Sequence, residues 1–283
     1  MPLIRASRSG GWGLAARRLL PALLLGGVLA LGPAAAARAC GPFSLAFYEL
    51  GLLYYRDASG KAHGIDLDLV DALAARSGCR FVPVLESRVR IWSQLADGRL
   101  DLSVSGIATP ERERFAEFMP YFQTRNFLML RRNVPAAAHN PDGFVARPEL
   151  RIAVVKSFKH GPRYDAWLAR LRERPGRVVE AADFDTVLRL FSVGRVDAFL
   201  SLPTSWLLAA RRQGLDATVT MLDWSPEDRV VHGLIVSLQR VPEVDRRRLS
   251  QALDSLHADG TVARILRRHA GPEWADKLVL ARP

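Results

Sequence analysis

Gly98-Arg-Leu-Asp-Leu-Ser-Val-Ser105 is repeated further along the chain as Gly194-Arg-Val-Asp-Ala-Phe-Leu-Ser201. Each copy follows apolar residues at helical spacing and leads into a short β-rich stretch. A helix that ends at glycine and continues into a buried strand is half of a parallel βαβ crossover. The repeat therefore predicts two similar α/β lobes, and the cleft between two lobes is a place where a ligand can bind.

The expected elements around the repeat extend both lobes. Strand 43–48, a helix capped by Asp66 and strand 81–85 precede the first copy and predict a βαβαβ unit, with functional loops at the carboxyl ends of its parallel strands. Extended crossovers near residues 126–132 and 230–238 predict a two-strand hinge. We assign the following ranges: 1–39 signal peptide, 40–130 and 232–283 lobe 1, and 131–231 lobe 2.

The stretch 1–39 has the pattern of a secretory signal peptide. Arginines at positions 5, 8, 17 and 18 precede an apolar run over 19–31, and Ala37-Arg38-Ala39 precedes Cys40. The run is shorter than the roughly 20 residues that a membrane-spanning helix needs. We expect cleavage after Ala39 and an exported, periplasmic protein. The alternative is a lipid anchor on Cys40, although Ala37 and Arg38 fit a lipoprotein signal poorly.

Cys40 and Cys79 are the two cysteines of the chain. An even number of cysteines in an oxidising compartment favours a disulfide. Each cysteine stands two or three residues ahead of an expected strand, and adjacent parallel strands would bring both to the same edge of the sheet. We predict a Cys40–Cys79 disulfide; the alternative is two unrelated thiols, one of them lipidated.

The formal net charge of +11 overstates the basic character of the exported chain. Residues 1–39 contain five arginines and no acid, which leaves +6 on the remainder. The remaining basic residues are scattered among acids, and aromatic residues do not alternate with a basic stripe. The charge pattern therefore argues against nucleic acid as a partner.

Several motifs together resemble family 3 of the bacterial extracellular solute-binding proteins. They are Gly64-Ile-Asp-Leu-Asp-Leu-Val70, Trp92 with Leu95, Gly106-Ile-Ala-Thr-Pro-Glu-Arg112, Phe118-Met-Pro-Tyr121 and Gly260-Thr-Val-Ala-Arg264. The resemblance covers nearly the whole mature chain. It implies an α/β, two-lobed periplasmic-binding-protein fold of type II, with a two-strand hinge and a cleft between the lobes. It also implies a receptor that serves an ABC transporter of polar amino acids.

The resemblance implies that Arg112 clamps the carboxylate of the ligand, with Thr109 and the backbone around Gly106 and Ala108 assisting. A planar guanidinium forms a bidentate, charge-assisted pair with a carboxylate, and glycine allows close approach of the backbone. Arg112 has a simpler alternative, a surface ion pair with a neighbouring acid, Glu111 or Asp101.

Aromatic residues near the expected cleft are candidates to cover the apolar part of the ligand. Trp92 has an alternative role, because an aromatic residue in the apolar stripe of a helix usually belongs to the core. The three candidates are Tyr48, Tyr54 and Trp92.

The second lobe departs from the family pattern. Amino-acid receptors of the family commonly carry an aspartate after the second repeat, where it pairs with the ligand ammonium, and here Ser201 or Leu202 takes that place. Either another acid, Glu49 or Asp185, replaces it, or the ligand is a carboxylate without an ammonium.

Basic residues in the second lobe are candidates for a second negative group. Lys156, Ser157 and Lys159 lie in a loop that resembles the family's loop at a helix start, and backbone N–H groups at a helix N-terminus bind anions. The alternative is a pair of lysines that decorate a solvated loop.

Signatures of catalysis are not found in the sequence. The six histidines have no metal-ligand spacing, and nucleophile-elbow, dinucleotide-binding and Walker motifs are missing. We therefore expect no catalytic residue, no metal and no cofactor. The leading hypothesis is a monomeric periplasmic protein that captures a small carboxylate-bearing ligand for an ABC transporter permease. Two alternatives remain: a dehydratase or lyase on the same fold with Glu49 as general acid, and a soluble sensor that docks on a membrane receptor.

Overall fold

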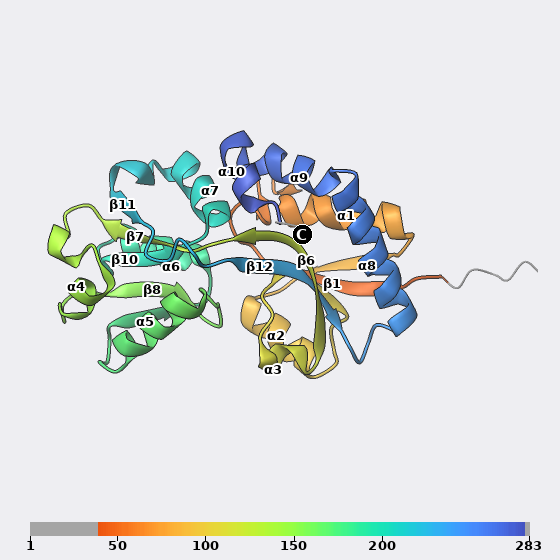
Figure 1. The fold of residues 1–283 in the computed structure, drawn as a ribbon, viewed down its shortest axis with the longest axis horizontal. Coiled ribbons are helices and arrows are strands. Elements are labelled where there is room, and N and C mark those ends of the chain that lie inside the picture. The colour runs from red at the N-terminus through yellow and green to blue at the C-terminus, as the bar shows by residue number, and fades with distance from the viewer. Residues whose placement is uncertain (1–38, 281–283) are drawn as a thin grey trace, which may run out of the picture. The chain divides into compact units, whose positions relative to one another are not determined.

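A computed structural model describes residues 39–280, which belong to one compact unit. The expected signal peptide, apart from Ala39, lies outside the described residues. Two five-stranded sheets with helices on their faces form two lobes (Figure 1). The α/β, two-lobed architecture that the repeat predicts is confirmed.

The first lobe is built on a sheet of order β4-β1-β5-β12-β6. β1, β4 and β5 are parallel, and β12 lies antiparallel between β5 and β6. α8 and α9 pack on α1, so the C-terminal part of the chain returns to this lobe, while α2 and α3 lie on the other side of the sheet (Figure 1). The strands are β1 (Phe43–Phe47), β2 (Tyr55–Arg56), β3 (Ala62–His63), β4 (Phe81–Leu85), β5 (Leu102–Gly106), β6 (Ala116–Thr124) and β12 (Val230–Ser237). The helices are α1 (Ile65–Ser77), α2 (Arg88–Ala96), α3 (Pro110–Glu113), α8 (Glu243–Ala258), α9 (Thr261–Ala270) and α10 (Pro272–Leu278).

The second lobe has a sheet of order β11-β7-β10-β8-β9, whose last three strands are parallel. One of its cores is built around Phe144, Tyr164 and Trp167. The strands are β7 (Phe127–Arg131), β8 (Ile152–Val155), β9 (Val178–Ala181), β10 (Ala198–Ser201) and β11 (Val219–Leu222). The helices are α4 (Pro141–Val145), α5 (Pro162–Arg172), α6 (Phe184–Ser192) and α7 (Pro203–Gln213), with 3-10 turns at Ala136–Ala138 and Leu215–Ala217.

The repeated sequence has the same structural role in both lobes. Gly98 and Gly194 have positive φ angles of 65° and 73°, which let the chain turn from α2 and α6 toward the buried strands β5 and β10. The aspartate of each copy then binds the neighbouring parallel strand. An Asp101 carboxylate oxygen accepts a hydrogen bond from Ser44 N (2.8 Å), and one of Asp197 accepts from Arg151 N (2.8 Å).

The two lobes are joined by two crossovers. β6 continues into β7 through Arg125 and Asn126, and β11 leads back to β12 through residues 223–229 (Figure 1). β7 pairs with β10 and β11, so it belongs to the second sheet, although the sequence pattern places residues up to 130 in lobe 1. The local pattern shows a strand at β7 but carries no information about the sheet that it joins.

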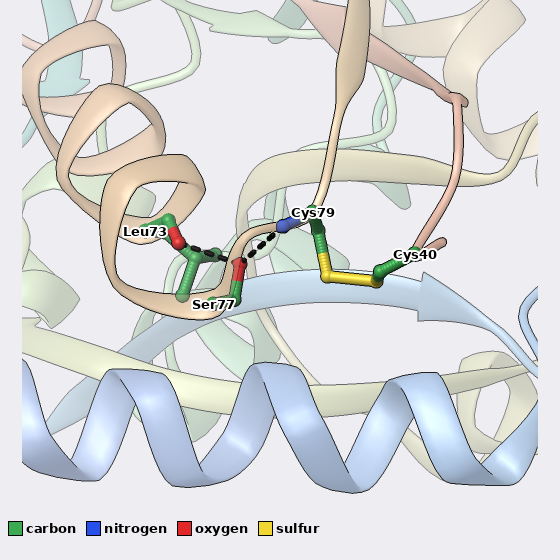
Figure 2. The surroundings of a disulfide bond; sticks show 4 residues. All are labelled: Cys40, Leu73, Ser77 and Cys79. Atoms are coloured by element: carbon green, nitrogen blue, oxygen red, sulfur yellow. Dashed lines mark hydrogen bonds between the residues drawn. A yellow bond between two sulfur atoms is a disulfide. The ribbon is translucent and has the colours of Figure 1, made fainter. Parts of the chain in front are cut away.

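Cys40 and Cys79 form a disulfide, as predicted (Figure 2). The bond joins the residues ahead of β1 to those ahead of β4, and both cysteines are buried. Ser77 supports the turn, because its hydroxyl donates to Leu73 O (2.7 Å) and accepts from Cys79 N (3.1 Å). The disulfide lies at the amino ends of the parallel strands, opposite the edge where ligands bind in such sheets.

Candidate ligand-binding cleft

Residues of both lobes line a central cavity of about 20 Å³. Two larger cavities adjoin it. One, of about 540 Å³, has Thr109 in its lining and is called the Thr109 cavity; the other, of about 320 Å³, has Glu86 in its lining and is called the Glu86 cavity. Phe158 lines all three and therefore stands between them. The central cavity is lined by Tyr48, Leu50, Arg88, Ser105, Ile107, Arg112, Asn126, Ser157, Phe158, Lys159, Leu202 and His232.

Arg112 connects the two lobes across the central cavity. Thr109 caps α3 and fixes the backbone of Arg112, whose N–H donates to Thr109 Oγ1 (3.4 Å). The guanidinium lies over the Trp92 ring, with Cζ 3.7 Å from the ring centroid, and donates to Ile107 O (2.9 Å) and to Ser157 O of the second lobe (3.0 Å). Burial, and then the charge of Arg88, lowers the pKa of Arg112 to about 10, so it stays charged at neutral pH.

Arg112 forms no ion pair with any described residue. The alternative role of Arg112, a surface ion pair with Glu111 or Asp101, therefore has no support. Asp101 pairs instead with Arg240 (2.9 Å) and binds Ser44. Glu111 interacts with Arg112 through its charge, but its carboxylate is not within ion-pair distance. Arg112 therefore presents its charge to the cleft.

Arg88, the first residue of α2, is a second cation of the central cavity that our sequence reasoning missed. Its side chain is buried, with Cζ 4.2 Å from the Tyr48 ring centroid and 5.0 Å from that of Trp92. It donates to Val104 O (3.3 Å) and Ser105 O (3.0 Å), and no described acid forms an ion pair with it. A signal was present in the sequence, since Arg88 closely follows the carboxyl end of the expected strand 81–85.

A buried carboxyl, that of Asp66, lies next to the central cavity, because it contacts the lining residue Ser105. Asp66 accepts hydrogen bonds from Tyr121 Oη (2.6 Å) and Ser105 Oγ (2.8 Å). Burial raises the pKa of Asp66 to about 7, although these two hydrogen bonds and the charge of Arg88 oppose the rise. Ser105 itself has a φ of 51°, and Ser157 across the cavity has a φ of 66°. Among the described residues these are the two non-glycine residues with positive φ, and such strain is typical of functional sites.

His232, at the start of β12, is another residue of the cavity that the sequence did not reveal. Its ring stacks on Phe122 at 4.5 Å and is buried. Nδ1 lies 3.2 Å from Ser105 O and must be the donor, because a carbonyl oxygen can only accept. Burial lowers the pKa of His232 to about 3, so the ring is neutral and Nε2 is an acceptor. Nε2 is buried and has no hydrogen-bond partner among the described residues.

The other predicted site residues lie in three cavities or outside them. Tyr48, Ser157 and Lys159 line the central cavity, and Trp92 and Thr109 line the adjoining Thr109 cavity. Tyr54 lines a separate cavity together with Glu49 and Asp185, away from Arg112. The remaining predicted residues lie outside these cavities: Gly106, which is buried against Ile235; Ala108, which is exposed; Lys156, which is exposed; and Ser201, which is buried with its hydroxyl bonded to Leu202 O.

The sequence matches the bacterial extracellular solute-binding proteins of family 3 over residues 52–272. The match covers most of the chain, and the protein belongs to this family. None of the curated protein sequences matches the chain.

Solved structures with the same fold differ in what they do. The arginine-, lysine-, histidine-binding protein ArtJ from Geobacillus stearothermophilus is 17% identical, with a TM-score of 0.69 over 84% of this chain and 99% of that one. A histidine kinase sensor domain is 19% identical, with a TM-score of 0.68 over 86% and 98%. The ancestral amino-acid-binding protein AncCDT-1, a precursor of cyclohexadienyl dehydratase, is 18% identical, with a TM-score of 0.63 over 80% and 94%. At these identities the likeness establishes the fold alone.

The described part of the chain offers neither a membrane span nor a metal site. Within residues 39–280, the helices are too short or too polar to cross a membrane. The same residues contain no cluster of three or more histidine, cysteine or acidic side chains that could hold a metal ion.

Proposed function

We propose that the protein is a periplasmic receptor that captures a small carboxylate-bearing solute in the central cavity and delivers it, as a monomer, to an ABC transporter permease. The observation that carries this proposal is Arg112, a charged guanidinium between the lobes with no ion-pair partner among the described residues. A carboxylate in the cavity would give it a bidentate partner. The names of the amino-acid-binding structures with this fold support a solute of the same size class.

Closure of the lobes on the ligand follows from the position of Arg112. It reaches the second lobe at Ser157 O, and Lys159 of that lobe adds a positive charge at the cavity. A ligand that touches both lobes favours the closed form by the contacts that it gains there.

The enzyme alternative has less support. Glu49, the expected general acid, lines the Tyr54 and Glu86 cavities but not the central one, and it pairs with Arg56 at 3.6 Å. A general acid must reach the atom that it protonates. The sensor alternative shares the proposed cavity and differs in the membrane partner.

The test is ligand binding by an Arg112→Gln variant, measured by calorimetry on protein refolded to remove bound solute. We expect binding of carboxylates to fall by at least about 30-fold, because a partly buried charge partner is lost. Arg114→Gln is the matched control, since Arg114 is an exposed arginine two residues later that bonds Glu111 O. Equal affinities of the two variants would contradict the proposal.

A further inference from the structure

The central cavity brings two guanidinium groups together. The Cζ atoms of Arg88 and Arg112 both lie within 5.0 Å of the centroid of the Trp92 ring. Within the described residues each guanidinium uses its hydrogen bonds on backbone carbonyls rather than on carboxylates. Like charges in a site of low dielectric repel each other, so two neighbouring cations without acid partners favour a ligand with two negative groups.

The central cavity has no acidic side chain that could pair with an ammonium group of the ligand. Its lining residues include no aspartate or glutamate. Asp185, one of the two acids expected as substitutes, lines the Tyr54 cavity, and Glu49, the other, lines the Tyr54 cavity and the adjoining Glu86 cavity but not the central one. Asp66 lies behind Ser105 and receives hydrogen bonds from Ser105 and Tyr121. An α-ammonium in the central cavity itself would meet two arginines without a counter-ion, since the nearest lining acids, such as Asp165, belong to the adjoining cavities.

His232 provides a different kind of recognition. Its Nε2 is a buried acceptor, and its ring lines the central cavity. Leaving such an acceptor unmatched is costly, and a hydroxyl of the ligand can satisfy it without adding positive charge.

Space for such a ligand requires a movement of Phe158. The central cavity of about 20 Å³ has room for one water-sized group. Phe158 separates it from the Thr109 and Glu86 cavities and packs edge-on against Tyr48 at 6.3 Å. Displacement of this side chain, or opening of the lobes, would join the three spaces.

We propose that the solute is a short hydroxy-dicarboxylate without an ammonium group, with its two acid groups on Arg112 and Arg88 and its hydroxyl on His232. This inference rests on the proposed function, because it takes a carboxylate at Arg112 as given. Arg88 then selects for the second acid group, and His232 selects for the hydroxyl.

The test compares three ligands with one carbon skeleton: L-malate, succinate and L-aspartate carry a hydroxyl, a hydrogen and an ammonium at the same carbon. Calorimetry on the refolded, exported protein should give affinities in that order, with malate at least tenfold tighter than aspartate. Binding of L-aspartate as tightly as malate would overturn the inference while leaving the proposed function intact. Loss of that aspartate binding in Asp165→Asn would identify the acid that replaces the missing counter-ion, since Asp165 lines the Thr109 cavity.

Variants of Arg88 and His232 distinguish the proposed role of each residue from that of Arg112. Arg88→Gln should weaken malate and succinate by at least about 30-fold and change butyrate, a monocarboxylate, by less than threefold. His232→Phe keeps an aromatic ring stacked on Phe122 and should reduce the affinity for malate to the affinity for succinate.

Arg88→Lys is the control for charge: it keeps the positive charge and should bind malate more tightly than Arg88→Gln does. The melting temperature of each variant without ligand shows whether the variant is folded. Equal losses for butyrate and malate in Arg88→Gln would overturn the second acid site. Failure of both monocarboxylates and dicarboxylates to bind the wild type would instead overturn the proposed function.

Discussion

At the scale of single residues, Arg88 occupies a place that local physical chemistry disfavours. It begins α2, where the helix dipole destabilises a cation, and it is buried beside a second cation, Arg112. The faces of Tyr48 and Trp92 compensate in part, since a desolvated cation–π contact contributes about 2 kcal/mol. Proteins keep such local conflicts mainly at functional sites. The conflict at Arg88 is therefore evidence that this part of the cleft is built for negative charge.

Two buried histidines make stability depend on pH. Burial lowers the pKa values of His160 and His232 to about 3, with Lys159 and Arg172 acting on His160 and Arg88 on His232. Unfolded histidine binds a proton below about pH 6.5, so between pH 3 and 6.5 the unfolded state holds more protons than the folded state. The stability contributed by each neutral histidine is present above pH 6.5 and is lost as the pH falls.

We predict that the wild type loses stability relative to His160→Gln as the pH falls below 6.5, with a slope that approaches about 1.4 kcal/mol for each pH unit near pH 5. Urea unfolding of both proteins at several pH values measures this difference. Asp66 has the opposite effect on the pH dependence of stability: its raised pKa stabilises the folded state as the pH falls from about 7 toward 4. Both proteins contain Asp66, so its contribution cancels in the difference between them. A difference that stays constant with pH would show that His160 does not resist protonation.

At the scale of elements, the repeat was enough to predict both lobes because its information is local. Helix-ending glycines and the aspartates that bind the next strand follow each other within a few residues. The central cavity was only partly predictable. Arg88, Asn126 and His232 come from distant segments, and the insertion of β12 between β5 and β6 brings them together. Local patterns do not encode that order. The place of Tyr54 in a different cavity could not be predicted for a similar reason, because its loop turns toward α7.

The disulfide links two elements of the first lobe, and its effect on stability can be separated from binding. The double variant Cys40→Ser/Cys79→Ser should lower the free energy of unfolding by about 3–4 kcal/mol, the value expected for a loop of this length. Chemical denaturation with and without reductant measures the loss. Reductant should destabilise the wild type and leave the variant unchanged. Ligand affinity at low temperature should stay within about twofold, because the bond lies at the opposite edge of the sheet from the cleft; a large loss of affinity would contradict this separation.

At the scale of the whole molecule, several contacts join the two lobes. Besides Arg112, the loop before β2 donates a hydrogen bond from Leu52 N to Thr204 O of the second lobe (2.7 Å). Arg125 and Asp223, one in each crossover, form an ion pair at 2.9 Å. If the lobes close on a ligand, as we propose, the Leu52–Thr204 contact lowers the conformational free energy that the ligand must supply.

Gly51 offers a way to oppose closure without touching the cavity. A Cβ at Gly51 would lie 2.4 Å from Ser205 Cα and 2.5 Å from Thr204 O, both in the second lobe, so Gly51→Ala should wedge the lobes apart. Gly60→Ala is the matched control, because Gly60 also has a positive φ but its Cβ would meet no atom within 4 Å. We expect Gly51→Ala to weaken carboxylate binding at least about tenfold, which is about 1.4 kcal/mol, and to increase the radius of gyration in solution scattering. Gly60→Ala should bind like the wild type and lose only stability. Wild-type affinity and an unchanged radius in Gly51→Ala would show that this contact does not limit closure.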